Sequence, residues 1–91
     1  SPPFMRLLRL IIEDKSQKKA NELCQHLAGE RKKVKGLQVV GYGACALELI
    51  NAKFRFYVLL RSHTHTPLLR VANYATQFKE VICDIDPIEF S

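Results

Sequence analysis

The stretch Lys53-Phe54-Arg55-Phe56-Tyr57-Val58-Leu59-Leu60-Arg61 decides the fold of this chain. Side chains alternate between the two faces of a β-strand, so its even-numbered residues, which are all apolar, share one face. The other face carries Lys53, Arg55, Tyr57 and Arg61, and its one apolar residue is Leu59. This alternation predicts a strand that builds a core on one side and presents cations and an aromatic ring on the other.

Composition limits the class of protein. A chain of 91 residues with 47% hydrophobic and 25% charged residues is typical of one soluble globular domain. The net charge of +5 favours an anionic partner, with nucleic acid first and acidic protein tails second. The three cysteines are odd in number and widely spaced, which favours a reducing cytoplasm over a disulfide framework. No apolar run is long enough for a membrane span, no secretory leader is visible, and the start at Ser1 indicates a fragment of a longer chain.

The rest of the chain alternates strand and helix patterns. Apolar stripes at helical spacing predict two helices, one capped by Ser16 and one capped by Thr66 with Pro67 in its first position. Strands are expected over residues 5–12, from residue 37 to residue 40, along the opening stretch, and over residues 80–86 up to a stop at Pro87. The turn into the opening stretch is expected at residues 51–52. Gly41 and Gly43 lack the further residues of a phosphate loop and favour a bulge between paired strands.

This order predicts an α+β fold of the split βαβ, ferredoxin-like type, βαββαβ. We expect a four-stranded antiparallel sheet with two helices on one face. Leu8, Leu10 and Ile12 should join the core under the helices. The other face of the sheet would be open or covered by a partner, and its apolar Leu7 and Ile11 favour partial cover.

Candidate chemical groups are few. Asp84 and Asp86 share one face of the last strand, where pairing with Lys or Arg is a better interpretation than acid–base chemistry. His63 and His65 lack a nearby third ligand for zinc. Lys32 and Lys33 belong to the densest basic run of the chain. These cations either interact favourably with the dipole at a helix C-terminus or contact phosphate. We therefore expect a binding module with no catalytic residue, no metal and no cofactor of its own.

Four stretches in register carry a resemblance to a known family. They are Pro2-Pro3-Phe4, Val39-Val40-Gly41, Lys53-Phe54-Arg55-Phe56 with Leu59-Leu60-Arg61-Ser62, and Asp84-Ile85-Asp86-Pro87. By these residues the chain resembles the C-terminal domain of primosomal protein N′, a bacterial replication-restart DNA helicase. It differs from the usual family pattern at Tyr42, Ala44 and Ala46, where prolines are usual, at Leu49, where arginine is common, and at Ala52, where glycine is usual.

The resemblance implies a domain organisation and partners. Residues 1–4 would be a linker from an upstream domain, and residues 5–91 a single C-terminal DNA-binding domain. The parent protein would be an ATP-dependent 3′-5′ helicase of the cytoplasm that carries ATP and zinc outside this fragment, which itself would be no enzyme. Implied partners are single-stranded or forked DNA, single-stranded-DNA-binding protein, and the helicase core of the same chain, with no membrane.

The residues and the resemblance together predict a nucleic-acid surface. Cations interleaved with rings suit electrostatic and stacking contacts with DNA. The predicted DNA-binding residues are Lys53, Arg55, Tyr57, Arg61, Arg9, Lys32 and Lys33. An ordinary solvated face remains a simpler interpretation of the strand. A docking module for the helicase core or an acidic peptide is the main alternative, and an RNA-binding or ribosome-associated domain is a third.

Overall fold

The structure is a computed structural model that describes residues 5–86. The predicted linker at residues 1–4 and the expected stop at Pro87 lie outside the described residues. Elements follow in the order β1 (Arg6–Asp14), α1 (Gln17–Gly29), a short 3₁₀ turn η1 (Glu30–Lys33), β2 (Gln38–Ile50), β3 (Lys53–Ser62), α2 (His65–Ala75) and β4 (Val81–Ile85). The predicted α+β, split βαβ plan is confirmed.

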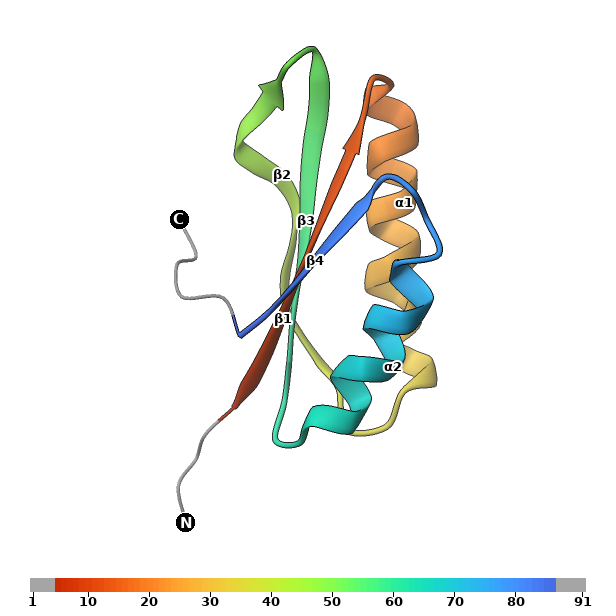
Figure 1. Cartoon of the computed structure of the whole chain (residues 1–91), viewed down its shortest axis with the longest axis vertical. Coiled ribbons are helices and arrows are strands. Elements are labelled where there is room, and N and C mark those ends of the chain that lie inside the picture. Colours follow the sequence, from red (N-terminus) through yellow and green to blue (C-terminus); the bar gives the residue numbers. More distant parts are fainter. Residues whose placement is uncertain (1–4, 87–91) are drawn as a thin grey trace.

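The sheet is antiparallel and has the strand order β2-β3-β1-β4. The opening stretch forms β3, which lies between β2 and β1. Both helices cover the same side of this sheet, and no helix of the described chain covers the other side (Figure 1). We call that uncovered side the free face. Its side chains come from the odd-numbered residues of β1 and β3, as the alternation predicts.

The hydrophobic core lies between the sheet and the helices. Leu10 and Val58 stand opposite each other in β1 and β3 and are fully buried. The remaining core side chains come from the helix-facing positions of β1 and β3, the apolar stripes of both helices and the first residue of β4: Leu8, Ile12, Phe56, Leu60, Ala20, Cys24, Leu27, Ala28, Leu68, Val71, Ala72, Ala75 and Val81. Burial of these groups is the main stabilising contribution to the fold. The face assignments made from sequence are therefore confirmed.

The start of α2 differs from the prediction. The helix begins at His65 with Thr64 at the N-cap, so Thr66 is not the capping residue and Pro67 is the third helical residue. The first-turn N–H groups of a helix have no intrahelical partner, so a proline costs no hydrogen bond anywhere in that turn. Ser16, by contrast, caps α1 as predicted, because its side chain accepts a hydrogen bond from the Lys19 N–H.

The second strand is longer than predicted. It continues through both glycines to Ile50, with register shifts between Val39 and Gly41 and between Ala44 and Leu49. The first shift confirms the expected bulge beside Gly41. The turn at Asn51 and Ala52 is also confirmed, and both residues have positive φ, 53° and 61°. Two successive positive φ values are those of a type I′ hairpin turn, whose twist matches the flanking strands.

Candidate nucleic-acid interface

The free face brings together most of the predicted DNA-binding residues. Arg55, Tyr57 and Arg61 share one face of β3 with Leu59 between them, and Arg9 lies opposite Leu59 in β1. Lys53 starts β3 at the opposite end from Arg61. The two central strands thus position three guanidinium groups and one phenol on an uncovered surface.

Two of these arginines form ion pairs across strands. Arg55 Nε donates to Glu13 Oε2 at 2.9 Å, and the two residues stand opposite each other in the β1–β3 register. Arg9 donates to Asp84 Oδ2 at 2.8 Å, again between directly opposed residues. The side chains of Arg9 and Arg55 are only about one quarter exposed. Their charges are therefore largely compensated inside the domain, while their guanidinium planes are fixed in place.

Arg61 has a neutral partner instead. Its Nε donates to Gln38 Oε1 at 2.8 Å, across the β2–β3 pair. This hydrogen bond orients the guanidinium without neutralising it, and Arg61 remains exposed. Lys53 is also exposed, and no ion pair to it occurs within residues 5–86. The uncompensated cations of β3 therefore stand at its two ends.

Tyr57 lies on the free face and covers a glycine. A Cβ placed on Gly41 would stand 3.3 Å from the Tyr57 hydroxyl and 3.8 Å from its ring carbon Cε2. The ring therefore leans from β3 towards β2 and is half-buried. It is less accessible to a stacking base than a fully exposed ring would be. Tyr42 is more exposed at 48%, but it pairs with Val58 and so belongs to the helix side of β2. The sequence did not predict Tyr42 as an exposed ring, because the bulge at Val40 determines which face of β2 the Tyr42 side chain lies on.

The middle of the free face is apolar. Leu7, Ile11 and Leu59 are half-buried there, and Ile82 from β4 is 54% exposed beside Ile11. The Arg9–Asp84 ion pair lies within this apolar strip, between Leu7 and Ile11, and the Arg55–Glu13 ion pair lies beyond Ile11. Such a surface can contact apolar groups of a partner as well as phosphates.

The remaining predicted site residues lie elsewhere. Lys33 ends η1, after the C-terminus of α1, and forms a 3.2 Å ion pair with Glu30. It is therefore on the helix side of the domain and does not join the free face. The side chain of Lys32 lies outside the described part of the structure.

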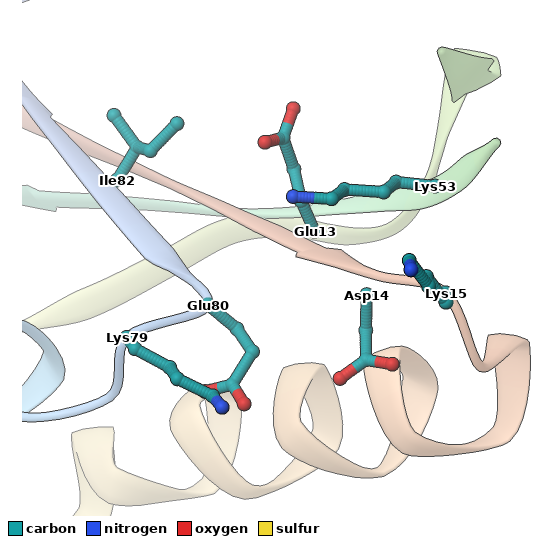
Figure 2. Close-up of a pocket in the computed structure, with 7 residues that line it drawn as sticks. All are labelled: Glu13, Asp14, Lys15, Lys53, Lys79, Glu80 and Ile82. Atoms are coloured by element: carbon teal, nitrogen blue, oxygen red, sulfur yellow. The ribbon is translucent and has the colours of Figure 1, made fainter. Parts of the chain in front are cut away.

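A mixed-charge hollow occupies the end of the domain where β1 ends and β3 begins. Lys15, Lys53 and Lys79 alternate there with Glu13, Asp14 and Glu80, with Ile82 at the margin (Figure 2). Glu13 already pairs with Arg55, and Asp14 accepts a hydrogen bond from the Ser16 N–H. Because cations and carboxylates alternate, the hollow presents no concentrated charge of either sign.

The described residues offer no metal centre. Within residues 5–86, no group of three or more His, Cys, Asp or Glu side chains could hold a metal ion, and His63 and His65 gain no third ligand. Burial raises the pKa of the Cys24, Cys45 and Cys83 thiols, which are all unpaired. For Cys45, nearby Arg55 and Arg9 oppose this effect. Raised pKa values disfavour the thiolate and hence nucleophilic chemistry.

The last strand anchors the start of the first. Asp84 pairs with Arg9, and Asp86 pairs with Arg6 at 2.6 Å while also accepting a hydrogen bond from the Leu7 N–H. The Arg6 hydrogen bond, followed by that of Leu7, holds the pKa of Asp86 below its usual value. The predicted pairing of both aspartates with arginine is confirmed.

Comparison with known proteins assigns the domain to a family. The fold defines a split βαβ domain with one uncovered sheet face. The chain belongs to the family of the primosomal protein N C-terminal domain, whose model matches residues 1–88. The replication restart protein PriA of Treponema pallidum (strain Nichols) is 27% identical over 95 residues, covering 96% of this chain and 14% of that protein. The resemblance identified from the sequence is thus confirmed.

A solved structure supports the fold alone. The de novo designed protein Foldit4 superposes with a TM-score of 0.64 at 12% identity, covering 90% of this chain and 93% of its own. This likeness concerns the architecture, which many functions share. None of the helices within residues 5–86 is long and apolar enough to cross a membrane.

Proposed function

We propose that this domain binds single-stranded or forked DNA during replication restart, through the free face of its sheet. The observation that carries the proposal is the convergence of Arg9, Arg55, Arg61 and Tyr57 from adjacent strands onto one surface without a covering helix. Phosphates would be neutralised by arginines that neighbouring side chains already orient. An unpaired base would stack on Tyr57, a contact worth about 1–3 kcal/mol.

The paired arginines suit this role in a specific way. An arginine has five N–H donors, and the Glu13 bond of Arg55 and the Gln38 bond of Arg61 each engage Nε. Within the described residues, no hydrogen bond engages the terminal N–H groups of either side chain, so these groups can donate to phosphate oxygens. Fixing the guanidinium in advance reduces the conformational entropy lost on binding. Backbone contacts of this kind give little sequence specificity.

A fluorescence-anisotropy titration of the 91-residue chain tests the proposal. The probes are single-stranded, duplex and forked oligonucleotides, each at two salt concentrations. We expect binding that favours single-stranded or forked DNA and weakens as salt rises. The combined replacement of Arg55, Tyr57 and Arg61 by Ala should abolish it. Unchanged affinity of that variant would contradict the proposal.

A second candidate function is protein docking. Its support is the apolar strip of Leu7, Ile11 and Leu59, together with the ion pairs that compensate Arg9 and Arg55. In this alternative the free face packs against the helicase core, or helps bind the acidic tail of single-stranded-DNA-binding protein. A titration with a labelled acidic peptide discriminates the two, because a docking face binds the peptide and leaves the oligonucleotides free.

The wider proposal concerns the longer protein. We place this domain in a cytoplasmic, ATP-dependent 3′-5′ helicase, whose ATP and zinc sites lie outside the 91 residues. The domain itself would act by binding, with no cofactor and no catalytic residue. Deleting the domain from the parent should then weaken fork binding more than ATP hydrolysis on saturating DNA.

A further inference from the structure

Three exposed cations that form no ion pair within the described residues lie together at one end of the sheet. This end is formed by the start of β2, the end of β3, η1 and the first two turns of α2. We call it the basic end and define it by Lys35, Arg61 and Arg70. Figure 1 shows these segments together at the lower end of the molecule, opposite the β2–β3 hairpin.

A contact between two segments brings the cations together. A Cβ on Gly36 would stand 3.8 Å from Pro67 Cγ, so the connection before β2 lies against the first turn of α2. Lys35 directly precedes Gly36. Arg70 follows Pro67 by one helical turn and therefore shares its side of α2. Both side chains are exposed, which leaves their charges in contact with solvent.

The carboxylates of this end are already in use. Glu30 pairs with Lys33, and Asp86 pairs with Arg6 and the Leu7 N–H. Within residues 5–86 no ion pair reaches Lys35, Arg61 or Arg70. The opposite end differs, because its lysines alternate with Glu13, Asp14 and Glu80 (Figure 2).

Helix dipoles do not explain the arrangement. Cations after the C-terminus of α1 are favourable there, which accounts for Lys33. Lys35 belongs to the connection that lies against the first turn of α2, where a helix carries partial positive charge, so no helix dipole accounts for its position. The exposed charges of this end are therefore available to a partner.

We infer that the basic end binds the phosphate backbone of a nucleic acid strand and extends the contact begun on the free face. The inference rests on the proposed function. Arg61 belongs to both surfaces. Its side chain lies on the free face near the end of β3, and its guanidinium donates a hydrogen bond to Gln38 at the start of β2, which is part of the basic end. A strand that stacks on Tyr57 can thus leave the sheet past Arg61 and continue over Lys35 and Arg70. The occupant is a polyanion with regularly spaced charges, which several clustered cations bind together.

The test uses two variants with the same change in net charge. Lys35→Gln/Arg70→Gln removes two cations from the basic end, and Lys18→Gln/Lys19→Gln removes two exposed cations from the first turn of α1 at the opposite end. Within the described residues, none of these four side chains forms an ion pair, so both variants should remain folded, which circular dichroism checks. Each is titrated with a fluorescein-labelled oligothymidylate and with an acidic peptide over a range of salt concentrations.

We expect the basic-end variant to lose affinity for the oligonucleotide by about tenfold at low salt. The slope of log K against log salt should fall by about 1.4, since each lost phosphate contact of a single strand contributes about 0.7. The control variant should keep the slope of the unmodified chain. Equal behaviour of the two variants would overturn the inference. Loss of peptide binding with unchanged oligonucleotide binding would also overturn it, in favour of an acidic protein partner.

The outcomes separate the inference from the proposed function. If the unmodified chain binds DNA in a manner sensitive to Tyr57 and Arg61, but both charge variants match, only the basic end is excluded. If the unmodified chain fails to bind the oligonucleotide at low salt, the free-face proposal and the inference both fail.

Discussion

The Tyr57 ring of β3 covers Gly41 of the neighbouring edge strand, with its hydroxyl 3.3 Å from the point where a Cβ on Gly41 would stand. A glycine in an edge strand exposes backbone, and an aromatic ring from the next strand compensates for the missing side chain. Tyr57 therefore has a structural role beside the proposed stacking role. The two roles can be separated by experiment.

We expect Tyr57→Ala to destabilise the domain by about 1 kcal/mol, because it uncovers Gly41 and removes partly buried ring surface. Tyr57→Phe should be nearly neutral, since the ring remains. Tyr42→Ala is the matched control, as that tyrosine is 48% exposed and should cost less. Urea unfolding followed by circular dichroism measures all three. Equal losses for Tyr42→Ala and Tyr57→Ala would argue against the structural role of Tyr57.

The hairpin turn gives a second prediction. Ala52 has φ of 61°, a conformation that disfavours any side chain with a Cβ by about 1–2 kcal/mol. Ala52→Gly should stabilise the domain by about 0.5–1 kcal/mol, once the greater flexibility of the unfolded glycine variant is subtracted. A domain of this size should then melt about 2–8 °C higher. Ala46→Gly, a change of the same type within β2, should lower the melting temperature. A lower melting temperature for Ala52→Gly would show that the turn adopts another conformation.

The fold could be predicted from the sequence because the alternation of side chains shows which residues of each central strand face the core. Alternation in β1 and β3 assigned the core, and one capped helix start, at Ser16, was found correctly. The start of α2 was misplaced because proline is acceptable at several first-turn positions, so Pro67 alone does not fix the first residue. The full length of β2 was missed because glycines and alanines carry weak strand preference, and pairing with β3 overrides it.

The candidate site was only partly visible in the sequence. The alternation of side chains predicted which cations lie on the free face, but it did not predict their hydrogen-bond and ion-pair partners. Arg55 and Glu13 are 42 residues apart, and only the β1–β3 register places them opposite each other. The basic end needs the contact between Gly36 and Pro67, which no local pattern indicates. The topology of the sheet is therefore needed to tell which predicted site cations have an ion-pair partner and which do not.

The Asp86 and Arg6 pair predicts a pH dependence of stability. Because Arg6 lowers the pKa of Asp86, the carboxylate contributes stability that is present above the usual aspartate pKa and is lost as pH falls through the lowered value. The stability difference between the unmodified chain and Asp86→Asn should therefore shrink as the pH is lowered from 7 through the acidic range. Unfolding by urea at a series of pH values measures it.

A double variant provides the control for this pair. Replacing Arg6 by Gln removes the main cause of the lowered pKa, so Asp86→Asn in that background should show a weaker pH dependence. The pair is exposed, with side-chain exposures of 41% and 42%, so the effect should also decrease at high salt. A difference that stays constant from neutral to acidic pH would contradict the assignment.

The ion pairs of the free face give the last prediction, on DNA binding. Arg55 is compensated by Glu13, whereas the partner of Arg61 is a neutral amide. Glu13→Gln should raise DNA affinity by several-fold at low salt, because it removes a negative charge near the phosphates while leaving a neutral acceptor for Arg55. Arg61→Gln should lower the affinity more than Arg55→Gln, since Arg61 is exposed with a neutral partner, whereas the Arg55 side chain is only one quarter exposed and its charge is already compensated by Glu13. Anisotropy titrations with one oligonucleotide rank the three variants. If Glu13→Gln leaves the affinity unchanged while Arg61→Gln still lowers it, DNA passes over the Arg61 end of β3 without approaching Arg55, and the contact surface shifts towards Lys35 and Arg70.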